Sequence, residues 1–163
     1  MKGFSTEDIK KIKDLSDTND KFDDFYSEKR EEWQKKTDPL YGISRGGLSA
    51  ADSDRIINAQ ALALSYRQEL QEEISYFLNK RTKSNSKLKE ESADKFMFYA
   101  TAFGLKTNTG EKAILIDSSV REHKREVDLI DIHIDFLRNT DGNLNSFLFS
   151  IKNVIALLEY LQK

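Results

Sequence analysis

The stretch SVREHKREVDLIDIHIDFL, residues 119–137, carries the pattern that decides the fold. Steps of three and four, the spacing of one helix face, separate its seam positions Val120, His123, Val127, Ile130, Ile134 and Leu137. Residues 130–136 also alternate by two, which is the spacing of a strand. Because the first pattern spans 18 residues and the second seven, we predict a helix. Ser119 and Glu122 have capping-box spacing at its start.

Segments on both sides of this stretch carry helical patterns too. Residues 52–79 place apolar side chains at helical steps, namely Ala59, Leu62, Tyr66, Leu70, Ile74 and Phe77. Residues 5–36 carry a thinner stripe, and aspartates predict a break near 17–20. The chain has one proline and seven glycines, so few residues interrupt helices. The fold class predicted is predominantly α.

Pro39 and the glycines that follow it predict a loop over residues 37–49. This loop gives the best boundary in the sequence. We therefore predict an N-terminal helical arm and linker over residues 1–48. A helical core follows over residues 49–163, with the binding and oligomerisation elements described below.

Two shorter interruptions are predicted within that core. Residues 100–117 have the pattern of a small β-hairpin, with a polar turn at 106–112 and an apolar strand at 113–116. Residues 139–143, which read NTDGN, have the local chemistry of a turn.

Composition excludes several classes of protein. The 163 residues include no cysteine, which excludes disulfides, thiolate nucleophiles and cysteine zinc sites. The N-terminal residues lack the apolar segment of a signal peptide, and no stretch approaches the roughly 20 apolar residues of a membrane span. We therefore expect a cytoplasmic protein without a membrane partner. The net charge of −2 makes the distribution of charges more informative than their sum.

Catalytic patterns are weak. The chain has two histidines, His123 and His133, and Ser118 or Ser119 could be imagined as a nucleophile. The glycines of a nucleophile elbow do not surround these serines. We predict a non-enzymatic protein with no cofactor.

A metal site is the more serious chemical rival. If residues 130–136 formed a strand, one face would carry Asp131, His133 and Asp135, which suit a divalent metal. A second set, Asp117, Glu122 and Lys124, weakly resembles the acid–acid–lysine set of some metal-dependent nucleases. On a helix the first set separates, and solvated carboxylates are the ordinary explanation. We assign no metal ligand, and the nuclease remains a less favoured alternative.

A basic stretch gives the best functional signal. The candidate nucleic-acid-binding residues are Lys80, Arg81, Lys83, Lys87, Lys89, Lys95 and Tyr99. Lysine and arginine neutralise phosphates, and aromatic rings such as Phe96 and Phe98 stack on unpaired bases. The alternative is a solvated basic loop followed by core aromatics.

The last helix has an unusually wide apolar stripe. The candidate oligomerisation residues on it are Phe147, Ile151, Val154, Ile155, Leu158 and Leu161. Such a stripe packs either in the core of its own domain or against other copies of the chain, and both can hold.

Four segments resemble the UvsY-like family of phage recombination mediators. Residues 149–161, FSIKNVIALLEYL, resemble the family's closing aromatic, Ile-Lys-Asn element and apolar helix. Residues 95–99, KFMFY, resemble its basic-then-tyrosine segment. Residues 31–38 and 61–66 loosely match its opening. The resemblance covers roughly residues 30–163, and the first 29 residues have no counterpart in it.

This resemblance implies a function. Such proteins form ring-like homo-oligomers, bind single-stranded DNA and help a RecA-like recombinase load where single-strand-binding protein already sits. Lys95 would match a DNA-contacting basic residue, and residues 147–161 would match the assembly element. A phage-encoded chain of this kind would act in DNA recombination and repair in the host bacterial cytoplasm. The main alternative is a structural or adaptor oligomer without nucleic-acid binding.

Overall fold

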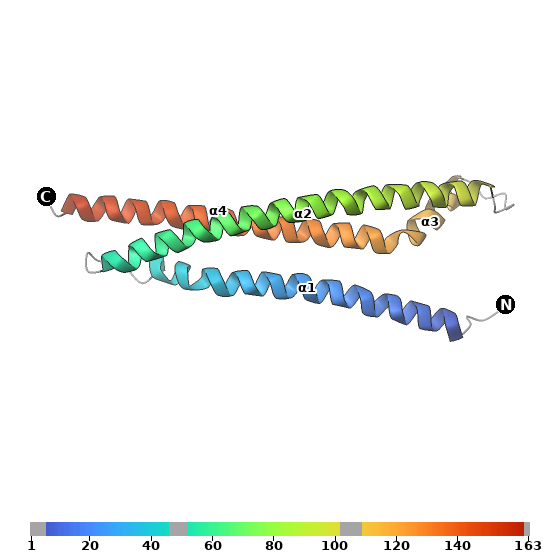
Figure 1. Cartoon of the computed structure of the whole chain (residues 1–163), viewed down its shortest axis with the longest axis horizontal. Coiled ribbons are helices and arrows are strands. Elements are labelled where there is room, and N and C mark those ends of the chain that lie inside the picture. The colour runs from blue at the N-terminus through green and yellow to red at the C-terminus, as the bar shows by residue number, and fades with distance from the viewer. Residues whose placement is uncertain (1–5, 46–51, 102–108, 162–163) are drawn as a thin grey trace. The chain divides into compact units, whose positions relative to one another are not determined.

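The computed structural model describes residues 6–45, 52–101 and 109–161, with side chains from residue 23 onward except those of residues 44, 45, 158 and 161. These ranges contain no strand and form the helices α1 (Thr6–Arg45), α2 (Ser53–Thr101), α3 (Thr109–Ser119) and α4 (Arg121–Leu161) (Figure 1). The predominantly α fold is therefore confirmed. Among the described residues, no helix combines the length and apolar character needed to cross a membrane.

Residues 130–136 are helical, as the longer pattern predicts, but the predicted β-hairpin is wrong. Residues 113–116, the expected strand, lie within α3. The first turn of α3 contains Glu111, whose charge favours a helix N-terminus. A short apolar run fits a strand and a helix equally well, which explains the error. Residues 102–108 of the expected hairpin lie outside the described residues.

The predicted turn at residues 139–143 is also wrong, because α4 continues through it. Packing on both sides of Gly142 accounts for this. The Thr140 hydroxyl donates to the Phe136 carbonyl at 2.9 Å, and Asp141 accepts from Arg67 Nε at 2.7 Å. Leu144 is fully buried. These contacts outweigh the local turn preference.

Helix α1 likewise continues where a break at 17–20 and a loop from residue 37 were expected. Both expectations are wrong over the described range. Thr37 is buried and donates to the Trp33 carbonyl at 3.0 Å, and Leu40 is buried one turn later. Pro39 removes one backbone donor, but the buried residues on either side keep the helix in register.

Helix α4 begins differently from the prediction. Ser119 is the last residue of α3, and its hydroxyl donates back to the Ile116 carbonyl at 2.8 Å instead of capping α4. Val120 forms the turn between the helices and is buried. Its N–H also donates to the Ile116 carbonyl, and its own carbonyl accepts from Lys124 N–H, both at 3.1 Å.

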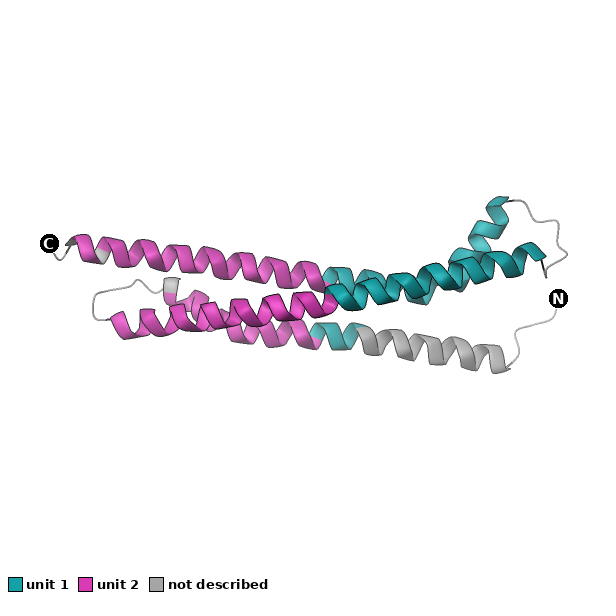
Figure 2. Cartoon of the chain, turned by 45° about the horizontal axis from the view of Figure 1, so that its top comes forward, with its two compact units in different colours: residues 1–27, 78–132 teal, residues 28–77, 133–163 magenta. Residues whose placement is uncertain are grey.

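The chain divides into two compact units (Figure 2). Unit 1 comprises residues 1–27 and 78–132, and unit 2 comprises residues 28–77 and 133–163. Each long helix contributes a segment to both units, and α3 belongs to unit 1. The division at residue 48 predicted from sequence partitions the chain differently and stays a prediction.

Unit 2 holds a continuous apolar core along three helix segments. Its buried apolar residues are Trp33 and Leu40 of α1, Ile56, Ala59, Ala63, Leu70, Ile74 and Phe77 of α2, and Ile134, Leu137, Leu144, Phe147 and Ile151 of α4. On the surface, Lys36 pairs with Glu69 at 2.8 Å. Unit 2 thus has the apolar seam expected of packed helices.

Unit 1 has fewer buried apolar residues in the range described. They are Tyr26 of α1, Val120, and Val127 and Ile130 of α4. Facing them, α2 contributes the buried Ser84, whose hydroxyl lies 3.3 Å from Glu126 Oε1. Helix α3 has no buried residue. Unit 1 is therefore the more polar of the two.

Candidate nucleic-acid interface

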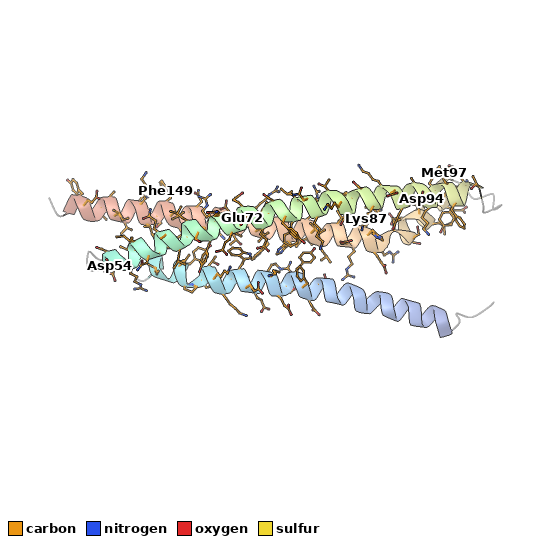
Figure 3. All side chains as sticks on the ribbon, viewed as in Figure 1. Asp54, Glu72, Lys87, Asp94, Met97 and Phe149 are labelled. Carbon is orange, nitrogen blue, oxygen red and sulfur yellow. The ribbon has the colours of Figure 1, made fainter. Side chains whose placement is uncertain are left out.

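Three of the predicted basic residues line one side of α2 in unit 1. Lys80, Lys83 and Lys87 follow one another at helical steps of three and four, which places them on neighbouring turns of one face. We call this set the basic ridge. Lys83 and Lys87 are exposed, and neither has an ion-pair partner in the described part of the chain (Lys87 is labelled in Figure 3).

Lys80 is the half-buried end of the basic ridge. Its Nζ donates to the Tyr26 hydroxyl at 3.3 Å and lies 5.6 Å from the centre of that ring. Tyr26 itself is fully buried, so its ring and hydroxyl give the lysine a fixed contact on the protein side. Lys80 is therefore more fixed than Lys83 and Lys87.

Arg81 and Lys89 lie off the basic ridge. Arg81 is paired with Asp131 of α4, and its Nη2 donates to Asp131 Oδ2 at 3.0 Å. Lys89 follows Lys87 by two residues, which turns it about 200° around the helix axis. The structure therefore brings together only part of the predicted basic set.

Lys95 lies in a different electrostatic environment. It lines a pocket of about 600 Å³ together with Glu91, Asp94, Phe98, Ser119, Glu122 and His123. Glu91 Oε2 lies 3.1 Å from His123 Nδ1. The three carboxylates of this pocket oppose the approach of a phosphate to Lys95.

The aromatic residues that follow Lys95 are exposed, except for Tyr99, which is half-buried. Phe96 is 54% exposed and Phe98 is 49% exposed. Tyr99 is half-buried, and its ring meets that of Phe98 edge to face, 5.5 Å between centres. Phe96 and Phe98 thus present accessible ring surface, which sequence alone could not decide.

The strand-based metal set does not form. Residues two apart on a helix point about 200° away from each other, and each member has its own partner. Asp131 pairs with Arg81, and Asp135 lies 3.8 Å from Arg138. His133 is buried against Glu73. Over the described ranges, no group of three or more acidic, histidine or cysteine residues is placed to hold a metal ion.

Within the second acidic set, Asp117 and Lys124 form an ion pair with each other, and the imagined serine nucleophiles bond to backbone carbonyls. Asp117 pairs with Lys124, whose hydrogen bond and charge hold the pKa of that exposed carboxyl below its ordinary value. The Ser118 hydroxyl donates to the Leu115 carbonyl at 3.4 Å. Ser119 bonds to the Ile116 carbonyl in the same way.

A buried polar network in unit 2 was not predicted from the sequence. Trp33 Nε1 donates to Glu73 Oε2 at 2.7 Å, and His133 Nε2 lies 3.4 Å from Glu73 Oε1. Burial raises the pKa of Glu73, but hydrogen bonds from His133 and Trp33 outweigh it and leave the pKa below its ordinary value. His133 also packs against Phe77, 4.6 Å between ring centres. The position of His133 in the sequence carried no sign of these partners.

The predicted oligomerisation residues face mainly inward. Phe147 and Ile151 are buried in unit 2, and Val154 and Ile155 are half-buried. The side chains of Leu158 and Leu161 lie outside the described residues. The opposite side of α4 exposes a different set, which we call the outer apolar face and which comprises Phe149 (65% exposed, labelled in Figure 3), Leu157 (57%) and Tyr160 (77%).

Comparison with known proteins assigns no family. No family model, curated protein or solved structure matched the chain. The functional argument therefore depends on the residues of this chain.

Proposed function

We propose that the protein is a non-enzymatic binder of single-stranded DNA that uses the basic ridge of α2. The observation that carries the proposal is the placement of Lys83 and Lys87 as exposed, unpaired cations on one helix face, within the described residues. Lysines of this kind attract phosphates without regard to base sequence, because binding releases condensed counterions.

Exposed aromatic rings favour a single strand over a duplex. Phe98 follows Lys87 by eleven residues, which places it about 16 Å along the helix axis and on the same side of α2, whereas Phe96 is turned about 180° away from Lys87. Each base that stacks on an aromatic ring contributes roughly 1–3 kcal/mol, and a duplex offers no unstacked base. Phe98, which is 49% exposed on the side of the basic ridge, therefore supplies a preference that the lysines cannot.

Acidic residues limit the affinity of one chain. Glu91 and Asp94 follow Lys87 at steps of four and three on the same side of α2, so the ridge ends there. A short cationic site gives weak binding by itself. A homo-oligomer presents several such sites to one strand and gains affinity by avidity.

The cellular role follows from the resemblance to UvsY-like mediators. On that basis the homo-oligomer assembles through α4 and helps a RecA-like recombinase load onto strands covered by single-strand-binding protein. It acts in recombination and repair in a host bacterial cytoplasm. The recombinase and the single-strand-binding protein are its expected protein partners.

The test is fluorescence anisotropy with a labelled poly-dT oligonucleotide and a duplex of equal length. We expect the wild type to prefer the single strand and the double variant Lys83→Ala/Lys87→Ala to bind it at least several-fold more weakly. The matched control is Lys35→Ala/Arg55→Ala, which removes the same charge from exposed positions of unit 2. Equal affinity of the two double variants would place binding elsewhere.

A structural adaptor is the second candidate, and the outer apolar face favours it. Three large apolar side chains on one exposed helix face are an ordinary basis for packing against another protein. An adaptor of this kind would assemble in solution and would not bind poly-dT even at low salt.

A further inference from the structure

One turn of α1 contacts cations from two other helices of unit 1. Asp23 and Tyr26 are three residues apart, so they lie next to each other on the helix surface. Asp23 pairs with Arg125 of α4, and the Tyr26 hydroxyl accepts from Lys80 of α2. Lys80 and Arg125 are therefore brought to the same turn of α1.

The two contacts differ in strength. Tyr26 is fully buried, so it fixes this turn of α1 in unit 1. The pair between Asp23 and Arg125 lies at the surface, with 41% and 45% of the two side chains exposed. Exposed ion pairs contribute little to stability and are easily exchanged. The Asp23 carboxylate can thus release Arg125 by a side-chain rotation while Tyr26 keeps α1 in place.

We propose that Arg125 is a further phosphate-binding residue and that the Asp23 carboxylate occupies its guanidinium until a nucleic-acid phosphate replaces it. The inference rests on the proposed function, since it extends the same surface from the basic ridge of α2 to α4. Lys80 joins the two parts, because the turn of α1 that carries Tyr26 also carries Asp23. A carboxylate and a phosphate both accept charge-assisted hydrogen bonds from arginine. The spacing of the phosphate oxygens suits two parallel hydrogen bonds from the planar guanidinium group.

This arrangement has a direct functional consequence. The internal carboxylate lowers the affinity of free protein for any isolated anion, because the anion must compete with Asp23. A strand that already lies on Lys83 and Lys87 holds its next phosphates at high local concentration and competes successfully. Binding is therefore selective for a continuous strand over single phosphates.

The variant Asp23→Asn tests this, with Asp24→Asn as the matched control. Both remove one negative charge from neighbouring positions, but Asp24 is exposed and has no ion pair within the described residues. We expect Asp23→Asn to bind poly-dT about two- to fivefold more tightly than Asp24→Asn, which is the range an exposed ion pair accounts for. Adding Arg125→Gln to Asp23→Asn should abolish the gain.

The outcomes separate this inference from the proposed function. Equal affinity of Asp23→Asn and Asp24→Asn, with the wild type binding poly-dT, overturns the inference and leaves the function standing. A gain in Asp23→Asn that survives Arg125→Gln also overturns it. If neither the wild type nor Asp23→Asn binds, the proposed function fails and the inference fails with it. Far-UV circular dichroism of each variant confirms that the helices are intact.

Discussion

The two units are built from the same three long helices but differ in what those helices bury. In unit 2, α2 buries an apolar residue at nearly every turn between Ile56 and Phe77. In unit 1, α2 buries Ser84 and leaves Phe96, Met97 and Phe98 exposed near its end. Helix α4 differs less, since it buries apolar residues in both units.

Under the proposed function, this difference separates the part of the molecule that supplies stability from the part that binds DNA. Buried apolar area is the main favourable term in folding, so unit 2 is expected to supply most of the stability. Unit 1 instead presents lysines and aromatic rings to solvent, where a ligand can reach them. A helix whose pattern changes along its length can thus perform both tasks without a domain boundary in the sequence.

The largest expected effect on the comparison of the two units is the loss of stability when a substitution creates a cavity in the core of unit 2. Leu70→Ala removes a fully buried side chain and should lower the free energy of unfolding by about 2–5 kcal/mol. The matched change in unit 1 is Leu88→Ala, where the side chain is half-buried, and it should cost clearly less. Urea denaturation of both variants measures this. Equal losses would show that unit 1 has as much core as unit 2.

The fold class could be predicted from the sequence because long helical patterns run through α2 and α4. These patterns cover more residues than the local strand and turn patterns that compete with them. Local turn chemistry failed at residues 139–143 and at Pro39, since contacts with residues far away in the chain stabilise the helix there. Asp141 is an example: its partner Arg67 is 74 residues away. No local rule contains that information.

The candidate site was predictable in composition but not in arrangement. The basic stretch was visible in the sequence, yet its members occupy different environments. Lys83 and Lys87 are exposed, Arg81 is paired with Asp131, and Lys95 lies among carboxylates of α2 and α4. The partner of Arg81 lies on another helix and 50 residues away in the chain, so no local pattern in the sequence contains this pairing.

The next prediction concerns the polar network in the core of unit 2. The folded-state pKa of Glu73 lies below its ordinary value of 4.5, so the unfolded state binds more protons in that range. Glu73 therefore stabilises the fold above about pH 4.5, and this contribution is lost as the pH falls through the folded-state pKa. Glu73→Gln should remove this part of the acid sensitivity, measured as the midpoint of urea unfolding against pH.

The exposed neighbour Glu72, labelled in Figure 3, supplies the control for this experiment. Glu72→Gln removes the same charge but does not touch Trp33 or His133, so it should keep the acid sensitivity of the wild type. If both variants behave alike, the network does not act through the Glu73 carboxylate.

A smaller effect tests whether the helices of unit 2 continue through their glycines. A Cβ atom at Gly42 or Gly142 would meet nothing within 4 Å. Because alanine loses less conformational freedom in a helix, Gly42→Ala and Gly142→Ala should each raise the free energy of unfolding by about 0.5–1 kcal/mol. A loss of stability would instead indicate a turn at that glycine, as the local sequence suggested.

The central claim is that the basic ridge of unit 1 contacts phosphates, and the salt dependence of binding tests it most directly. The slope of log K against log salt should become shallower by about 1.4 in Lys83→Ala/Lys87→Ala, since each lost phosphate contact to a single strand removes about 0.7. The control Lys35→Ala/Arg55→Ala should keep the wild-type slope. An unchanged slope in the ridge variant would contradict the account, because the two lysines would then neutralise no phosphate.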